Sequence, residues 1–260
     1  MTHISILNKN YDINLESLFL RHNQLYSLPI AICKLINLQK LDLYYNKLSS
    51  LPVAIGNLIN LKILELTENK LSSLPVAIGK LINLQELHLA GNQLSSLPAV
   101  IENLINLQFL NLSYNKLNSL PTTIGNLINL KRLHLANNKL INLPTTIGKL
   151  INLRELILED NQLSSLPATI GNLINLKRLY LANNKLTNLP VSILNIKNSM
   201  SIDETSYEIN NLDIKSTILI FKQLAINIEN LPINIKEVWL NSEIHNPNIK
   251  LPFGCEIKIY

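Results

Sequence analysis

The stretch that decides the fold reads Leu61-Lys62-Ile63-Leu64-Glu65-Leu66-Thr67-Glu68-Asn69-Lys70-Leu71-Ser72-Ser73-Leu74-Pro75-Val76-Ala77-Ile78-Gly79-Lys80-Leu81-Ile82-Asn83. Its pattern, LxxLxLxxNxLxxLPxxIGxLIN, returns every 23 residues along most of the chain. The prolines that mark it are Pro29, Pro52, Pro75, Pro98, Pro121, Pro144, Pro167 and Pro190. Such a period is typical of stacked repeats, because one unit has no core of its own and neighbours bury a shared one.

Each part of the unit has its own structural expectation. The alternation in Leu64-Glu65-Leu66 predicts a short strand with its leucines on one face, so residues 38–43 and their equivalents every 23 positions should be strands. Pro75 fixes φ and has no N–H, which predicts that the chain turns back there. The apolar residues that follow, up to Leu81, are spaced for a short helical return segment.

At two further positions of the repeat, most units of this chain have the same residue. One is a turn asparagine, whose amide can bond both N–H and C=O groups of the backbone, so we predict that the whole column is buried. This asparagine ladder comprises Asn23, Asn46, Asn69, Asn92, Asn115, Asn138, Asn161 and Asn184. The other is a glycine, which predicts a tight position in the return segment; its members are Gly56, Gly79, Gly125, Gly148 and Gly171. Cys33 occupies the same position in the first unit, which favours a packing role over a catalytic one.

On these motifs the sequence resembles the leucine-rich repeat family, in its 23-residue LPxxI class. Proteins of the Ras-suppressor and scaffold type carry that class, as do bacterial and giant-virus proteins. The resemblance implies an α/β solenoid, curved like a horseshoe, with a parallel sheet on the concave face and short helical or 3-10 segments on the convex face. It further implies a role in protein–protein interaction.

The repeats suggest three regions: an N-terminal cap over residues 1–14, eight 23-residue repeats over 15–198, and a C-terminal capping region over 199–260. We expect the first region to be irregular. In the last, the repeat pattern fails near Met200, and residues 214–227 fit a helix or, being rich in isoleucine, a strand. Two shorter Leu-Pro units, residues 231–240 and 251–260, resemble FNIP-type repeats and predict that the sheet continues, with Cys255 in a turn.

Composition excludes several classes of protein. The 260-residue chain is 47% hydrophobic and 16% charged, which is too apolar for a disordered protein. A net charge of +5 without a dense basic run makes nucleic acid an unlikely ligand. The two cysteines exclude a disulfide framework, and apolar runs are too short to span a membrane. With no signal-like start, we expect a cytoplasmic, monomeric protein.

No catalytic or metal-binding motif is present in the sequence. His88 and His134 share a repeat position but lie two units apart, about 9–10 Å at the spacing of strands, which is too far to share a metal. We expect both to be exposed. The sequence therefore predicts no metal, no cofactor and no enzymatic activity.

What remains is the solvent face of the predicted sheet, where the residues vary from unit to unit. We predict that a protein partner binds there, at Asp42, Tyr44, Tyr45, Glu65, His88, Phe109, Tyr114, Arg132 and Tyr180. Exposed aromatic residues are enriched among interface hot spots, and aromatics are scarce in this chain. Asp42 and Glu65 are adjacent like charges with only Lys40 to offset them, and this acidic patch is either a seat for a basic partner segment or merely solvated.

Two other interpretations of the sequence stay open. Arg132, Glu155 and Arg178 stand on consecutive predicted strands, which favours an ion ladder within the sheet over a binding site. The whole chain is either an interaction module, a purely structural protein, or an adaptor or enzyme whose activity lies in residues 199–260.

Overall fold

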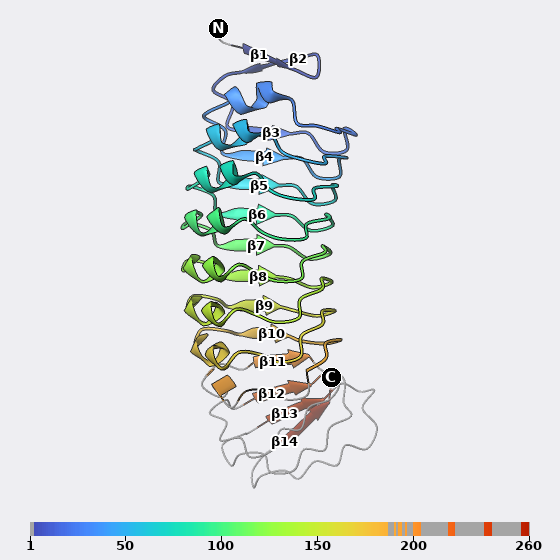
Figure 1. Ribbon diagram of the computed structural model, residues 1–260, viewed down its shortest axis with the longest axis vertical. Coiled ribbons are helices and arrows are strands. Elements are labelled where there is room, and N and C mark those ends of the chain that lie inside the picture. Colours follow the sequence, from blue (N-terminus) through green and yellow to red (C-terminus); the bar gives the residue numbers. More distant parts are fainter. Residues whose placement is uncertain are drawn as a thin grey trace.

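The computed structural model describes residues 3–186, positions 190, 192–193 and 196, and four further strands over 200–203, 218–221, 237–240 and 256–259. The strands are stacked along the long axis of the molecule, with a column of short 3-10 helices on one side and a column of turns on the other (Figure 1). This arrangement is a repeat solenoid, and the predicted fold class is confirmed in its parallel sheet and 3-10 segments.

Eight three-residue strands form the regular part of the sheet. They are β3 (Ser17–Phe19), β4 (Lys40–Asp42), β5 (Ile63–Glu65), β6 (Glu86–His88), β7 (Phe109–Asn111), β8 (Arg132–His134), β9 (Glu155–Ile157) and β10 (Arg178–Tyr180). All pair in parallel and in register one repeat apart, so that Leu41 lies opposite Leu64 and Leu64 opposite Leu87. The central leucine of each strand is buried in the core, while its two neighbours lie on the opposite side of the sheet, as the period of two requires.

Seven 3-10 helices form the return segments of the fully described repeats. They are η1 (Ile30–Lys34), η2 (Val53–Asn57), η3 (Val76–Lys80), η4 (Ala99–Asn103), η5 (Thr122–Asn126), η6 (Thr145–Lys149) and η7 (Ala168–Asn172). Each begins after the repeat's proline: Pro75 is extended (φ −67°, ψ 148°), and its carbonyl accepts from Ile78 N–H over 2.9 Å. Leu81 N–H then donates to the Ile78 carbonyl, which ends the short helix.

The core lies between the sheet and these helices. Leucines and isoleucines from every repeat, such as Ile55, Leu58 and Leu61 with Leu64, are fully buried and form one continuous cluster. The glycine position is tight, as predicted: a Cβ on Gly56 would lie 2.8 Å from the carbonyl oxygen of Ala77 in the next repeat.

The asparagine ladder holds consecutive turns together. Asn69 Nδ2 donates to the carbonyls of Leu43 (3.0 Å) and Leu66 (3.1 Å), and its Oδ1 accepts from Leu48 N–H (3.0 Å). Asn46, Asn69, Asn92, Asn115, Asn138 and Asn161 are all buried. The prediction of burial is wrong for Asn23, which is exposed because no earlier repeat supplies the carbonyl that covers its successors, and Asn184 is only half-buried.

Both ends differ from the expectation. The N-terminal segment is not irregular: β1 (His3–Ile6) and β2 (Lys9–Asp12) form an antiparallel hairpin, which contacts η1. At the other end, β11 (Met200–Asp203) continues the 23-residue register, with Ile202 opposite Leu179 in place of the missing leucine.

Three more parallel strands follow: β12 (Ile218–Phe221), β13 (Glu237–Leu240) and β14 (Glu256–Ile259). Of the two alternatives for residues 214–227, helix or strand, the strand is found at 218–221, where β-branched isoleucines pair with β11. The predicted continuation of the sheet at 238–240 and 257–259 is found, while Cys255 lies outside the described residues.

Candidate protein-interaction face

The outward side chains of β3–β10, together with the third and fourth residues after each central leucine, make up one continuous surface that we call the sheet face. Its backbone is fixed by the parallel ladder and by the asparagines beneath the turns. The side chains on it are therefore presented by a rigid scaffold, as recognition requires.

One column of the sheet face has an unusual backbone conformation. All eight of its members have positive φ, between 52° and 63°: His22, Tyr45, Glu68, Gly91, Tyr114, Asn137, Asp160 and Asn183. Glycine, asparagine and aspartate tolerate this left-handed region, whereas a bulky side chain is strained there. Tyr45 and Tyr114 are nevertheless placed in it, and they are 56% and 63% exposed.

The N-terminal part of the sheet face is aromatic and basic. The rings of His22 and Tyr45 lie 4.8 Å apart, and Tyr44 contacts both. Lys40 lies over the ring of Phe19, which is 58% exposed. Phe19 and His22 are not among the predicted contact residues, although each shares a repeat position with one of them: Phe19 with Asp42, and His22 with Tyr45.

Asp42 is not part of a free acidic patch. Its carboxylate is completely buried and pairs with Arg21, whose Nη2 lies 2.6 Å and whose Nε lies 2.7 Å from Oδ2. The other oxygen accepts from Tyr44 N–H at 3.2 Å. The interpretation that only Lys40 offsets Asp42 is wrong, because Arg21 reaches it from the preceding repeat, and Asp42 is withdrawn as a contact residue.

The centre of the sheet face is a packed aromatic stack. Phe109 lies between His88 and His134, with ring centroids 5.0 Å and 4.8 Å away, and Arg132 covers it at 4.1 Å. Phe109 is consequently only 8% exposed, and the two histidines are mostly buried as well. The expectation that His88 and His134 are exposed is wrong, and Phe109 supports Arg132 rather than offering its own ring.

Carboxylates flank this stack on both sides. His88 lies 3.0 Å from Glu86 and 3.7 Å from Glu65, while Glu155 lies 3.5 Å from both His134 and Arg178. The predicted ion ladder is thus present between Glu155 and Arg178, but Arg132 stacks on Phe109 instead. Glu65 also accepts a hydrogen bond from Thr67 N–H at 2.7 Å, so one of its carboxylate oxygens is already bonded within the turn.

Burial lowers the pKa of His134, and the positive charges of Arg132 and Arg178 act in the same direction. Glu155 opposes this shift, but its oxygen is 3.5 Å away and the buried Nε2 has no hydrogen-bond partner. This geometry indicates that desolvation outweighs the attraction to Glu155, so His134 favours the neutral form in the folded protein.

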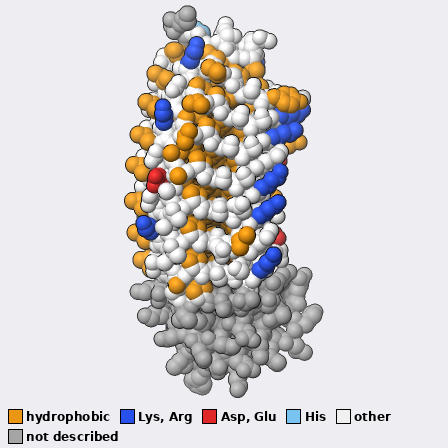
Figure 2. All heavy atoms as spheres, viewed as in Figure 1, with side chains coloured by type: hydrophobic (Ala, Val, Ile, Leu, Met, Phe, Trp, Pro, Cys, Tyr) orange, Lys and Arg blue, Asp and Glu red, His pale blue; other side chains and the backbone are white. Residues whose placement is uncertain are grey.

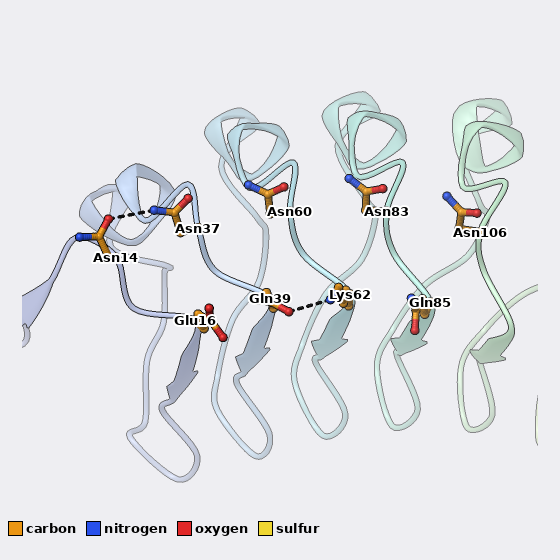
Figure 3. Close-up of a pocket in the computed structure, with 9 residues that line it drawn as sticks. All are labelled: Asn14, Glu16, Asn37, Gln39, Asn60, Lys62, Asn83, Gln85 and Asn106. Atoms are coloured by element: carbon orange, nitrogen blue, oxygen red, sulfur yellow. Dashed lines mark hydrogen bonds between the residues drawn. The ribbon is translucent and has the colours of Figure 1, made fainter.

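A separate polar groove of about 610 Å³ runs across the first repeats, between two columns of polar side chains (Figure 3). Its asparagines bridge neighbouring units, as when Asn60 Nδ2 donates to the carbonyl of Ile36 at 2.9 Å. Lys62 in turn donates to Gln39 at 2.8 Å. These hydrogen bonds connect neighbouring repeats, so the groove is explained by the way the repeats stack on one another.

The described part of the chain holds neither a helix that could span a membrane nor a cluster of metal-binding side chains. Its helices are too short to cross a membrane. Within the same residues, no group of three His, Cys, Asp or Glu side chains is placed to hold a metal ion.

A stacked parallel sheet with returning 3-10 helices and a buried asparagine ladder defines a repeat scaffold. Comparison with known proteins agrees: the leucine-rich repeat region family matches residues 53–138 and 77–162, and two further leucine-rich repeat families match 13–71 and 151–198. The chain belongs to the leucine-rich repeat family. No curated protein sequence matches it.

Among solved structures, the chain is similar to a leucine-rich repeat protein of Leptospira interrogans, with 29% identity and a TM-score of 0.55. The match covers 94% of this chain and 83% of that one. Leucine-rich repeat domains generally mediate protein–protein interaction and are typically non-catalytic scaffolds.

Proposed function

We propose that the sheet face binds a protein partner and that Tyr45 and Tyr114 are its principal contacts. The observation that carries this proposal is their conformation: two large, exposed rings occupy a left-handed position that glycine, asparagine or aspartate fills in four of the other six repeats. Local strain of this kind is characteristic of functional sites, where the strained residue is needed for something other than folding.

The surroundings of the tyrosines support the same use. Tyr45 belongs to the aromatic cluster with His22 and Tyr44, and Tyr114 lies on the turn after the stack that contains Phe109. Tyrosines offer a large, rigid contact area with a polar tip, and they are enriched among residues that dominate binding energy. Arg132, exposed above Phe109, is a further contact of the type found at interfaces.

A photo-crosslinking residue tests which face is used. We would place p-benzoylphenylalanine at position 45 or 114 and, as a control, at Val76, which is exposed on η3 on the opposite side of the repeat. After irradiation in a lysate of the source cells, the proposal expects the same protein adduct from 45 and 114 and none from 76. An adduct from 76 alone would move the site to the helical side.

A substitution adds the energetic test. Tyr114→Asn installs the residue that Asn137 and Asn183 already show in this position, so the fold should tolerate it. Capture of the crosslinked partner should fall at least about tenfold, which corresponds to one hot-spot residue. Phe109 is unsuitable for this purpose, because its buried ring supports both histidines and its loss would disturb the sheet.

A further inference from the structure

A second exposed column gathers positive charge along the edge of the solenoid. It begins directly after the asparagine ladder and contains lysine in five repeats and glutamine in the others. We define the lysine row as Lys47, Lys70, Lys116, Lys139 and Lys185. Figure 2 shows Lys and Arg side chains aligned along one edge of the molecule, opposite the edge that carries the 3-10 helices in Figure 1.

The backbone fixes this column as a regular ladder. Lys70 N–H donates to the carbonyl of Leu48 over 2.9 Å, and the N–H groups of Lys116, Lys139 and Lys185 make the same bond to the preceding repeat over 2.8–2.9 Å. Neighbours in such a ladder are about 4.8 Å apart, so the row extends over roughly 29 Å from Lys47 to Lys185. Lys47 and Lys70, like Lys116 and Lys139, therefore lie within the screening length of about 8 Å at physiological salt, whereas Gln93 and Gln162 widen the other two gaps to about 9.6 Å.

The row has little counter-charge of its own. In the described chain, Lys47 donates to Gln24 and Tyr26 and lies over the Tyr26 ring, and Lys116 donates to Gln93; none of these partners is acidic. Lys70, Lys116, Lys139 and Lys185 are exposed. Like charges on adjacent repeats, as in Lys47–Lys70 and Lys116–Lys139, are unfavourable for folding, so the arrangement indicates a role outside the fold.

The residues beside the lysine row indicate which class of ligand fits this surface. In the described repeats, the two positions after the next leucine are exposed serines and asparagines, apart from Tyr26 and Ile141: Tyr26, Ser27, Ser49, Ser50, Ser72, Ser73, Ser95, Ser96, Asn118, Ser119, Ile141, Asn142, Ser164 and Ser165. Apart from Tyr26, whose ring lies under Lys47 at the N-terminal end, they offer hydrogen bonds but no series of aromatic rings of the kind on which single-stranded nucleic acid stacks its bases. A single file of charges also suits a linear ligand better than a broad lipid surface.

From these observations we propose that the lysine row binds an extended acidic peptide segment of a protein partner, at a surface distinct from the sheet face. Side chains on one face of an extended peptide repeat about every 6.6–6.8 Å, and the flexible lysine side chains can bridge the difference from the repeat spacing. Attraction of this kind accelerates association and depends strongly on salt.

The test uses the full chain and a fluorescein-labelled oligoglutamate peptide, followed by fluorescence anisotropy. The row variant replaces all five lysines by glutamine, the residue that Gln24, Gln93 and Gln162 already place in this column. The control variant makes five lysine-to-glutamine changes elsewhere, at Lys34, Lys62, Lys80, Lys131 and Lys149, and so has the same net charge. Oligothymidylate and phosphatidylserine vesicles are the competing probes.

We expect the row variant to bind oligoglutamate at least about tenfold more weakly and the control variant to remain within about twofold of the unchanged protein. Equal losses in both variants, or no binding by the unchanged protein, would overturn the proposal. Tighter binding of oligothymidylate or vesicles that depends on the row would replace the acidic peptide by nucleic acid or lipid. Tyr114→Asn should not affect oligoglutamate binding. A failure of the lysine-row proposal can therefore be distinguished from a failure of the proposed binding by the sheet face.

Discussion

The side-chain nitrogen of Asn115 donates a hydrogen bond to the backbone carbonyl of Leu89, in the preceding repeat, over 2.9 Å. It also donates to the carbonyls of Leu112 and Ser113, and its oxygen accepts from Leu94 N–H at 2.9 Å. One amide therefore satisfies backbone groups of two repeats that water cannot reach. The same geometry recurs in the inner turns, which explains why the column contains no substitute for asparagine.

Asn115→Ala should lower the free energy of unfolding by about 2 kcal/mol or more, because buried backbone groups lose their partners. Asn106→Ala is the matched control, since Asn106 is exposed and makes one bond, to the carbonyl of Ile82 at 2.9 Å. Its cost should stay below about 1 kcal/mol. Urea denaturation of both variants measures the difference, and equal losses would show that the two columns have equivalent roles.

Tyr114→Asn should leave the protein as stable as before or raise the unfolding free energy by up to about 1 kcal/mol, since asparagine adopts the left-handed conformation more readily than tyrosine. Asn137→Tyr is the reciprocal change in a neighbouring repeat and should destabilise by a similar amount. Thermal melting of the two variants checks the sign. A marked loss of stability in Tyr114→Asn would mean that the ring stabilises the turn and that its position needs no functional explanation.

The spacing of the sequence was sufficient to place strands, turns and return segments, because each column of a solenoid has the same environment in every inner repeat. It could not give the direction of long side chains on the surface. Arg21 reaches Asp42 from the preceding repeat, and Arg132 turns away from Glu155 onto Phe109; both choices depend on competing partners. At the C-terminal end, the isoleucines near 218–221 are compatible with a helix or a strand. They form a strand because this segment pairs with β11 and β13, which the local sequence does not show.

Gly148→Ala should destabilise the protein by about 1–3 kcal/mol, because the new Cβ would collide with the backbone carbonyl oxygen of Thr169 in the next repeat. That threonine is held in place by its own bond to the carbonyl of Thr145, at 2.6 Å, so it cannot easily withdraw. Gly56→Ala is the control: its Cβ would meet the Ala77 carbonyl at 2.8 Å, and no side-chain bond of this kind fixes Ala77. Unfolding midpoints should rank Gly148→Ala below Gly56→Ala, and the reverse order would contradict the assigned cause.

The last prediction concerns acid. The unfolded chain protonates His134 as the pH falls below its ordinary pKa of about 6.5, whereas burial keeps the folded side chain neutral to a lower pH. In that window the unfolded state binds more protons, so stability should fall with pH through this residue and be fully present above about 6.5.

His134→Asn removes the titration and installs the residue of the neighbouring strand, Asn111, in the same column. The variant should therefore lose less stability than the unchanged protein between about pH 7.5 and pH 5.5, as measured by melting temperature at each pH. If Glu155, 3.5 Å away, instead captured the protonated ring in a strong ion pair, the unchanged protein would gain stability from His134 on acidification. In that case the His134→Asn variant would lose more stability on acidification than the unchanged protein. This result would contradict the prediction and show that attraction to Glu155 exceeds the cost of desolvation.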